Sequence, residues 1–532
     1  MQISLLQILS RTGAIAENCN AILEKARAFP ASELCLCPAN ALFGFDLGCW
    51  SQFPSMEQGI VDALNVLAQQ SPTPFLLPLL YPFKDGRAPA FYLLDHGQVQ
   101  MLPLSPIEAQ FRSPETPTLS FCELPWRGET IILLFAFCEN PDARPLGVLQ
   151  LLVDPASLCM LPKGSAVFVF TQLPWWHGLE LVLEAEMSEL ACSLRTQALL
   201  VNPVGLEDGI LYHGQSSCYD RLGALSMRLK AFSEDAGSLV LRKDAIANFS
   251  PDPDSQAMSL SLLFRALVFG TQEFVATSAC TELFIGLSGG MDSALALVIA
   301  CEAIGKEHVH AVFMPSPYTS AESVALVTEM VKRFGVPYHE IPIAHLMETY
   351  AAVLGDVFAH MPASPSDTTF ENIQARIRGT LLCALANRAN GLVVNTGNKS
   401  EAAMGYSTLY GDTIGAFSVL GDVEKTRVYD LAAWYNAHHS VQIPQEILTR
   451  PPSAELRPNQ KDSDSLPPYE DLDPCIQSLL QGVLPTDCPG EVAERLFRTE
   501  FKRRQSPLAI CVSQKTFGHT WRIPVTGHFS PK

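Results

Sequence analysis

The sequence predicts an α/β protein that is built from two parts. Short aliphatic or aromatic runs of strand length alternate with helical patterns through most of its 532 residues. Hydrophobic residues make up 48% of the chain and charged residues 17%. This composition fits a compact folded enzyme and argues against a disordered scaffold. A chain of this length can also hold more than one domain with a large core.

The first part, residues 1–235, has the pattern of a layered α/β domain. Its apolar runs are of strand length and are separated by longer segments. Residues 236–257 are polar and contain prolines, so we expect a linker there and a second part at 258–532. The strands expected in the first part are 3–8, 33–36, 131–136, 166–170 and 198–201.

The second part alternates helices and strands in a regular order. This alternation predicts a doubly wound parallel sheet, in which the ligand binds at the carboxyl ends of the strands. The expected elements are a helix at 260–277, a strand at 283–287, a helix at 294–304, a strand at 309–314, a helix at 321–334, a strand near 338–343, a helix at 372–389 and a strand at 391–395.

Residues 288–293, Ser-Gly-Gly-Met-Asp-Ser, form the most informative segment of the chain. They join a predicted buried strand to a helix, and two adjacent glycines allow a tight turn whose N–H groups point at one anion. The N-terminal end of the helix adds positive charge, which suits a phosphate or pyrophosphate. Ser288 and Ser293 supply hydroxyl donors, and Asp292 supplies a carboxylate for magnesium. The segment lacks the Gly-Lys-Ser/Thr of a Walker A loop and is similar to the loop of enzymes that cleave ATP between its α- and β-phosphates.

A second polar cluster follows the last predicted strand and should lie at the same edge of the sheet. Glu401 is placed to complete a magnesium shell with Asp292, because magnesium prefers a few carboxylates together with phosphate oxygens. Lys425 and Arg427 offer positive charge for phosphate. Any one of these residues is more simply a solvated loop residue, but the set indicates a nucleotide site. The cluster consists of NTGNKSE at 395–401 and YSTLYGD at 406–412.

Charge and cysteine content exclude several classes of function. The net charge of −19 argues against nucleic acid or an anionic membrane as the main partner. The 15 cysteines show no paired zinc spacing, so we expect reduced thiols and a cytoplasmic enzyme. The N-terminal MQISLLQILSRTG has neither a basic leader nor a long apolar run, so we expect no signal peptide and no membrane span.

Five stretches of the second part resemble, in order, the synthetase domain of glutamine-dependent NAD synthetases. The resemblance implies a Rossmann-like fold of the adenine nucleotide α-hydrolase type. It also implies that ATP adenylates the nicotinate carboxylate of deamido-NAD, releasing pyrophosphate, and that ammonia then displaces AMP to give NAD. The stretches are SGGMDS (288–293), ENIQARIRGTLL (371–382), NTGNKSEAAMGYSTLYGD (395–412), PSAELRPNQKDSDSLPPYEDLD (452–473) and EFKRRQSP (500–507).

The same resemblance implies a role for individual residues. Asp292 and Glu401 would hold Mg²⁺, Lys425 would contact the phosphate that leaves, and Asp292 and Lys425 would be the catalytic pair. No covalent nucleophile is needed, because positioning and charge stabilisation carry such a transfer. The basic run at 502–504 fits a solvated helix face as an alternative. ATP would be bound by Ser288, Gly289, Gly290, Met291, Asp292, Ser293 and Thr396, and deamido-NAD by Asn372, Arg376, Arg378, Glu401 and Lys502.

The first part resembles the nitrilase-type amidase domain of the same family, an α-β-β-α sandwich. That domain uses a cysteine nucleophile, a glutamate base and a lysine that stabilises the oxyanion. Cys138 occupies the nucleophile position in Phe-Cys-Glu-Asn, but Ala39 stands where the family has its glutamate. No lysine lies between Lys84 and Lys163, so the family's lysine has no counterpart there.

These losses predict that the first part does not hydrolyse glutamine. Without a base, the Cys138 thiol would stay mostly protonated near its ordinary pKa of about 8.5. Without the lysine, the oxyanion would lose a stabilisation that is typically worth about 3 kcal/mol. Glu139 and Glu33 are the two candidates for a replacement base, and their spacing favours neither.

Three functions follow from the sequence. The leading one is an ATP- and Mg²⁺-dependent NAD synthetase that takes free or partner-supplied ammonia. The second is an active glutamine-hydrolysing NAD synthetase with an altered triad. The third is a non-catalytic assembly protein that binds nucleotides, which would not need all five stretches. The resemblance further implies a homo-oligomer with small-molecule substrates (deamido-NAD, ATP and ammonia or glutamine).

Overall fold

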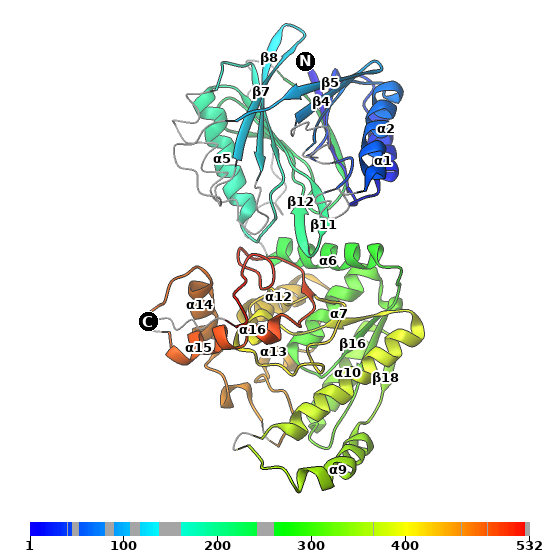
Figure 1. The fold of residues 1–532 in the computed structure, drawn as a ribbon, viewed down its shortest axis with the longest axis vertical. Coiled ribbons are helices and arrows are strands. Elements are labelled where there is room, and N and C mark those ends of the chain that lie inside the picture. The colour runs from blue at the N-terminus through cyan, green and yellow to red at the C-terminus, as the bar shows by residue number, and fades with distance from the viewer. Residues whose placement is uncertain are drawn as a thin grey trace. The chain divides into compact units, whose positions relative to one another are not determined.

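The computed structural model of the chain forms two compact units, Met1–Leu262 and Leu263–Lys532 (Figure 1). Within the residues described, no helix combines the length and the apolar character that crossing a bilayer requires. The structure describes residues 1–39, 41–44, 53–79, 90–106, 118–137, 161–241, 260–364, 367–458, 460–486 and 488–526.

The first unit contains two large sheets. One has the strand order β15-β1-β2-β3-β4-β5, and the other has the order β14-β13-β10-β9-β8-β7-β6. The strands of the first sheet are β1 (Gln2–Gln7), β2 (Leu34–Leu36), β3 (Phe75–Leu79), β4 (Ala90–Asp95), β5 (Gln98–Pro103) and β15 (Asp235–Val240). Those of the second are β6 (Ser105–Pro106), β7 (Thr118–Trp126), β8 (Glu129–Phe137), β9 (Ala166–Thr171), β10 (Gln197–Val201), β13 (Ser217–Tyr219) and β14 (Leu225–Arg228), and β11 (Val204–Glu207) pairs with β12 (Ile210–His213).

Four layers result from the alternation of side chains along these strands. Ile3 and Leu5 of β1 join Leu133 and Phe168 of the second sheet in one core, which therefore lies between the sheets. Leu6 points to the opposite face, where a second core contains residues of two helices. These helices are α1 (Ile15–Arg27) and α2 (Pro54–Gln70), and α5 (Leu179–Leu194) packs on β10 and β13. The expected α-β-β-α sandwich is confirmed.

The expected start of the linker at residue 236 is wrong. Residues 235–240 form β15, which pairs antiparallel with the whole of β1, from Gln7 opposite Asp235 to Gln2 opposite Val240. The sequence DAGSLV looks polar because β15 is an edge strand whose residues are only partly buried. The described part of the first unit therefore continues to Leu241, past the residue at which the polar composition had placed the start of a linker.

The second unit contains a six-stranded sheet in which every adjacent pair of strands is parallel. Its order is β18-β17-β16-β19-β20-β21, so the chain builds one half outward from β16 and then returns to build the other half. Strand order therefore reverses between β16 and β19, and ligands of open α/β sheets bind at such a point. The strands are β16 (Leu283–Gly286), β17 (Val309–Phe313), β18 (Tyr338–Glu340), β19 (Leu392–Asn395), β20 (Phe417–Ser418) and β21 (Leu508–Ala509).

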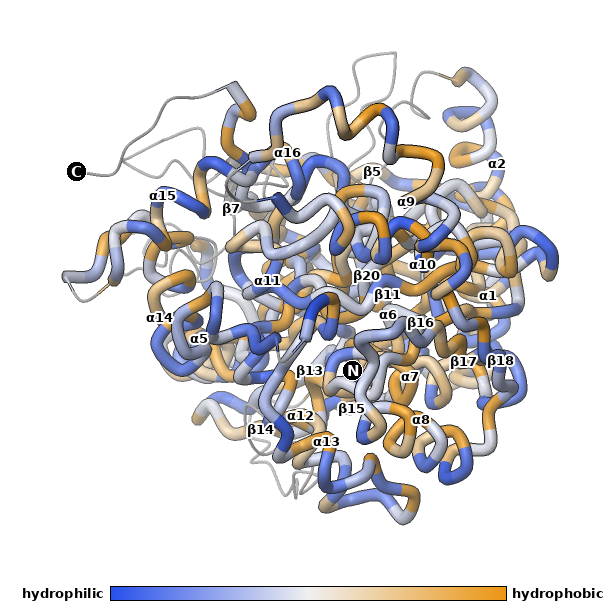
Figure 2. The backbone as a smooth tube through the Cα atoms, turned by 90° about the horizontal axis from the view of Figure 1, so that it is seen from below, coloured by the Kyte–Doolittle hydropathy of each residue, from blue (hydrophilic) through white to orange (hydrophobic). Residues whose placement is uncertain are grey.

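Helices cover this sheet as expected for a doubly wound fold. α7 packs on β16 and β17, and its residues are buried and hydrophobic along much of its length (Figure 2). α10 packs on β16 and β19. The helices are α6 (Leu260–Thr277), α7 (Met291–Ile304), α8 (Ala321–Phe334), α9 (Ala344–Phe358), α10 (Thr369–Ala389), α11 (Lys399–Met404), α12 (Lys425–His438), α13 (Gln445–Thr449), α14 (Tyr469–Leu480), α15 (Gly490–Arg498) and α16 (Glu500–Arg503), with the short 3₁₀ turns η3 (Lys306–His308) and η4 (Asp462–Asp464).

Two details differ from the sequence-based expectation. α7 begins at Met291 and not at residue 294, so Asp292 and Ser293 belong to its first turn. The prediction of reduced thiols is wrong for one pair, because Cys475 of α14 and Cys488 form a disulfide, with their Cα atoms 5.5 Å apart. The side chains of both cysteines pack in the same apolar cluster between α14 and α15, which brings them together. No other cysteine in the described ranges belongs to a disulfide.

Burial of His213 predicts a stability of the first unit that depends on pH. Burial, reinforced by the charge of Arg228, lowers the pKa of His213 to about 3, whereas an unfolded histidine titrates near 6.5. Below about pH 6.5 the unfolded chain binds a proton that the folded unit excludes. The free energy of unfolding should therefore fall by about 1.4 kcal/mol per pH unit as the pH drops from about 6 towards 3.

Urea unfolding between pH 7.5 and 5 measures this effect. We expect His213→Gln to flatten the pH dependence, and His345→Gln, at an imidazole that is 90% exposed, to leave it unchanged. An identical slope in the wild type and in His213→Gln would show that His213 is not the titrating group.

Candidate active site

A cavity of about 370 Å³ lies at the carboxyl ends of the strands in the second unit. It is bounded by the loop after β16, by the residues after β19 and by the start of α12. This is the reversal point of the sheet, where the sequence predicted the two polar clusters to meet. All seven residues predicted to bind ATP line it, namely Ser288, Gly289, Gly290, Met291, Asp292, Ser293 and Thr396.

The hydroxyl groups of two serines fix the backbone of the loop after β16. The Ser288 N–H donates to Ser293 Oγ at 3.2 Å, and the Gly290 N–H donates to Ser288 Oγ at 3.2 Å. Gly289 has a φ of +82°, a left-handed conformation that suits glycine. A Cβ at this position would lie 3.1 Å from the carbonyl oxygen of Ser323. The loop therefore presents bare backbone to the cavity, at the N-terminal end of α7 where an anion is favoured.

Asp292, Glu401 and Lys425 form a compact ion cluster on the cavity wall. Lys425 Nζ donates a hydrogen bond to Asp292 Oδ2 and lies 3.6 Å from Glu401 Oε1. Asn398 Nδ2 donates to the other oxygen of Asp292 at 2.9 Å. Asn398 also begins α11 with a capping box, in which the Glu401 side chain accepts from the Asn398 N–H at 3.2 Å. The polar cluster after β19 thus reaches the loop after β16, as predicted.

The cluster is short of positive charge. Burial, followed by repulsion from Asp292, raises the pKa of Glu401 to about 8, and Lys425 opposes the rise. Burial would lower the pKa of Lys425, but Asp292 and Glu401 outweigh it and hold the lysine charged. Asp462 lines the same cavity, and burial raises its pKa too. One lysine therefore serves three carboxyl groups, an arrangement that suits an added cation.

Magnesium fits this donor set. Across the described residues there is no group of three His, Cys, Asp or Glu side chains arranged to enclose a metal ion. Magnesium needs fewer, because it is usually bound through one or two carboxylates and keeps phosphate oxygens and waters as its other ligands. Asp292 and Glu401 supply two carboxylates beside a predicted phosphate loop.

The residues predicted to bind deamido-NAD fall into two groups. Glu401 and Arg378 line the cavity, and burial lowers the pKa of Arg378 to about 10 while its Nε donates to the Met314 carbonyl at 3.1 Å. The other three are outside the cavity lining and bind the segment at 405–409. Thr408 donates to Asn372 at 2.7 Å, Arg376 donates to the Leu409 carbonyl at 3.2 Å, and Lys502 donates to the carbonyls of Gly405 and Ser407 at 2.8 and 2.7 Å.

Lys502 and Arg427 differ in their surroundings, which bears on the roles considered for them from the sequence. Lys502 is partly buried, and its ammonium group donates hydrogen bonds to two carbonyls. The alternative of a solvated helix face is therefore wrong for this residue. Arg427, the other cation considered for phosphate, is 41% exposed and lies 3.8 Å from Asp430 on the surface of α12. It is absent from the lining of the cavity, so only Lys425 of the pair faces the site.

Sequence reasoning missed several cavity residues. Arg450 bonds Ser323 at 2.7 Å and Glu455 at 2.5 Å, and these contacts fasten the segment after α13 to the start of α8. Arg450, Ser323 and Glu455 all line the cavity, as do Asp412 and Asp462. Glu455 and Asp462 stand within the fourth family-like stretch and Asp412 at the end of the third, so the signal was present there. Arg450 and Ser323 lie outside all five stretches.

Comparison with known proteins decides the family. The profile of the NAD synthase family matches residues 263–506. A glutamine-dependent NAD(+) synthetase of Thermotoga maritima is 41% identical over 71% of this chain and 73% of its own length. Another from Synechocystis is 30% identical and covers 100% of this chain and 99% of its own. The chain belongs to the glutamine-dependent NAD(+) synthetase family.

Solved structures of this family share the fold of both units. A glutamine-dependent NAD⁺ synthetase from Acinetobacter baumannii in complex with ADP is 26% identical, with a TM-score of 0.72 and 98% of each chain covered. One from Cytophaga hutchinsonii has a TM-score of 0.76 at 15% identity, covers 99% of this chain and 98% of its own, and supports the fold alone. The chain is therefore a C–N bond-forming ligase of the NAD synthetase family, as predicted.

In this NAD synthetase, the position that the resemblance assigns to the amidase glutamate is occupied by an apolar residue, Ala39. Ala39 follows the carboxyl end of β2 and is buried in the core between the two sheets of the first unit. Glu33, the alternative base, precedes the other end of β2 and pairs with Arg127 at 2.7 Å. Its hydrogen bond from the Gln2 N–H lowers its pKa. Cys138 and Glu139 lie outside the described residues, and Lys163 is exposed.

Gly289→Ala tests whether this loop binds the phosphates. The new Cβ would strain a left-handed backbone and press on the Ser323 carbonyl, at a cost of about 1–3 kcal/mol. We expect the KM for ATP in NAD formation to rise about tenfold or more.

Gly482→Ala is the matched control for this variant. Gly482 has a φ of +80° and open space around its Cβ position, and it is not a lining residue of the cavity. It should lose a similar amount of stability and keep the wild-type KM. An unchanged KM for Gly289→Ala would contradict the assignment.

Proposed function

We propose that the second unit makes NAD from deamido-NAD in two steps. A nicotinate carboxylate oxygen attacks the α-phosphorus of ATP, and pyrophosphate leaves. Ammonia then attacks the carbonyl carbon of the acyl adenylate, and AMP leaves to give the amide. The observation that carries the proposal is the buried Lys425 between Asp292 and Glu401, directly beside the glycine loop. The ADP bound by the relative from Acinetobacter baumannii supports a nucleotide at this fold.

The residues divide the chemistry of the first step among them. The loop at 288–290 and the start of α7 would bind phosphate oxygens through the Gly289 N–H, the first N–H groups of α7 and the hydroxyls of Ser288 and Ser293. Lys425 compensates charge that builds on the departing pyrophosphate. Asp292 and Glu401 would hold Mg²⁺, which would neutralise further phosphate charge when bound. Arg378, a partly buried cation that lines the cavity, would be available for deamido-NAD.

For the nitrogen donor, we propose ammonia, either free or supplied by a partner. Ala39 cannot accept a proton, and Glu33 is committed to Arg127 at the opposite end of β2. A thiol with no base at hand reacts slowly with an amide. The proposal therefore rests on the absence of a carboxylate at position 39 and not on a feature of the second unit.

A second candidate, glutamine as the donor, is favoured by the names of the relatives. The Synechocystis protein matches this chain over its full length and is called glutamine-dependent, and so is the Thermotoga protein. This agrees better with the alternative of an active amidase than with the ammonia proposal. The homo-oligomer and the cytoplasmic location expected from the sequence stay predictions.

One assay separates these possibilities. The purified chain is supplied with ATP, magnesium and deamido-NAD, and either ammonium or glutamine is added as the donor. NAD from ammonium alone would support the proposal, and equally fast NAD from glutamine would overturn the ammonia-only reading. In that second case Cys138→Ala should abolish the glutamine reaction alone. NAD from neither donor would refute synthetase activity altogether.

Lys425→Met tests the ion cluster directly. The substitution keeps an unbranched side chain of nearly the same length but removes its charge, and we expect kcat with ammonium to fall by about 10² to 10³. Arg427→Met is the control, because it removes a cation two residues further along α12 on the exposed surface. Similar kcat values for both variants would show that Lys425 has no special role. Circular dichroism confirms that each variant is folded.

A further inference from the structure

Helix α12 carries Lys425 as its first residue, but the residue before it does not cap the helix. The Glu424 side chain accepts no hydrogen bond from the first turn. The first N–H groups of a helix have no partner within the helix, and in a buried setting they need one from elsewhere. Lys425 is 2% exposed, so water does not satisfy this end of the helix.

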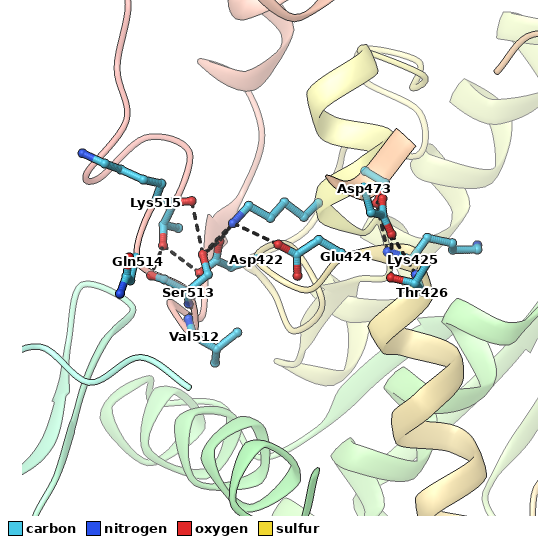
Figure 3. A network of polar contacts seen from close by, with 12 residues as sticks. Asp422, Glu424, Lys425, Thr426, Asp473, Val512, Ser513, Gln514 and Lys515 are labelled. Carbon is cyan, nitrogen blue, oxygen red and sulfur yellow. Dashed lines mark hydrogen bonds and ion pairs between the residues drawn. The ribbon is translucent and has the colours of Figure 1, made fainter. Parts of the chain in front are cut away.

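Two side chains from other helices take over the capping. Ser400 Oγ of α11 accepts from the Lys425 N–H at 2.9 Å. Asp473 Oδ2 of α14 accepts from the Thr426 N–H at 2.9 Å and from the Thr426 hydroxyl at 2.8 Å. Ser400 also donates its own hydroxyl to the other oxygen of Asp473. Figure 3 shows Asp473 facing Thr426, next to Lys425 at the start of α12.

The carboxylate is therefore the centre of a closed buried network. Asp473 is 2% exposed and Ser400 is fully buried. A buried charge is costly unless hydrogen bonds satisfy it, and Asp473 receives three of them. Its negative charge also lies at the positive end of the α12 dipole, which favours it further. One oxygen of the Asp473 carboxylate accepts from α11 and the other accepts from α12, so this single group links the two helices.

The residues that hydrogen-bond to Asp473 are sequence neighbours of two members of the ion cluster. Ser400 directly precedes Glu401, and Thr426 directly follows Lys425. Any shift of α12 relative to α11 would change the 3.6 Å separation of Lys425 Nζ and Glu401 Oε1 and would break hydrogen bonds to Asp473. We propose that Asp473 is a positioning residue, which sets Lys425 against Asp292 and Glu401 by capping α12 from outside. This inference rests on the function proposed above for the second unit.

Asp473→Asn is the variant that tests it. The amide keeps the shape of the side chain but loses the charge and one acceptor, so Lys425 should be held less firmly. Misplacement of a catalytic group by about 1 Å can cost about a hundredfold, and we expect kcat with ammonium to fall by about ten- to a hundredfold. The KM for ATP should stay close to the wild-type value, since the glycine loop is untouched.

A double-mutant cycle separates positioning from general destabilisation. In the Lys425→Met background, measured with enzyme in excess over substrate, Asp473→Asn should cost little further, because its effect acts through Lys425. Additive losses would overturn the proposal, and so would a wild-type kcat for Asp473→Asn alone. If Asp473→Asn does not fold, Ser400→Ala is taken through the same cycle with the same criteria.

Asp220→Asn in the first unit is the matched control. Asp220 is also fully buried, and it accepts from the N–H groups of Leu222 and Ala224 at 2.8 and 3.0 Å. It should lower stability and leave kcat with ammonium unchanged. An equal loss of kcat in Asp220→Asn and Asp473→Asn would show that loss of any buried aspartate lowers activity, which contradicts a positioning role. A wild-type chain that makes no NAD would refute the proposed function instead.

Discussion

The second unit depends on charge compensation by a single lysine. Lys425 is buried between Asp292 and Glu401, which come from the start of α7 and from α11. Two carboxylates so close together would repel each other without it, and a buried unpaired charge costs several kcal/mol. Segments more than a hundred residues apart are therefore held at one point. The glycine loop, the capping box of Asn398 and the start of α12 all take their positions around this cluster.

The two units differ in whether the candidate site residues also hold the fold together. In the first unit, Ala39 lies in the apolar core between two intact sheets. A small apolar residue can be buried in such a core at no electrostatic cost, whereas a glutamate there would need partners for its charge. The sandwich is therefore compatible with an apolar residue at position 39. In the second unit the polar residues of the site also connect α11, α12 and α14, so losing them would disturb the packing of those helices.

The sequence predicted most of the fold and the centre of the site, because both depend on local patterns. The bounds of α6 and α8 agree with the structure to the residue, and the run at 288–293 marked a loop that lines the cavity. What it missed depends on distant pairing. The edge strand β15 was missed because its side chains are only partly buried and its one neighbouring strand, β1, is more than 200 residues away in the sequence. Arg450 and Ser323 lie far apart in the chain and become neighbours only when the cavity forms.

The pairing of β15 with β1 brings two distant segments of the first unit together. Met1 and Leu241 exchange backbone hydrogen bonds in both directions, so the residue before β1 and the residue after β15 lie side by side. A domain whose ends meet in this way can be joined to another chain, or cut from it, without opening its own sheets. A unit of this kind can be exchanged as a whole while its own sheets stay closed, whichever nitrogen donor the enzyme uses.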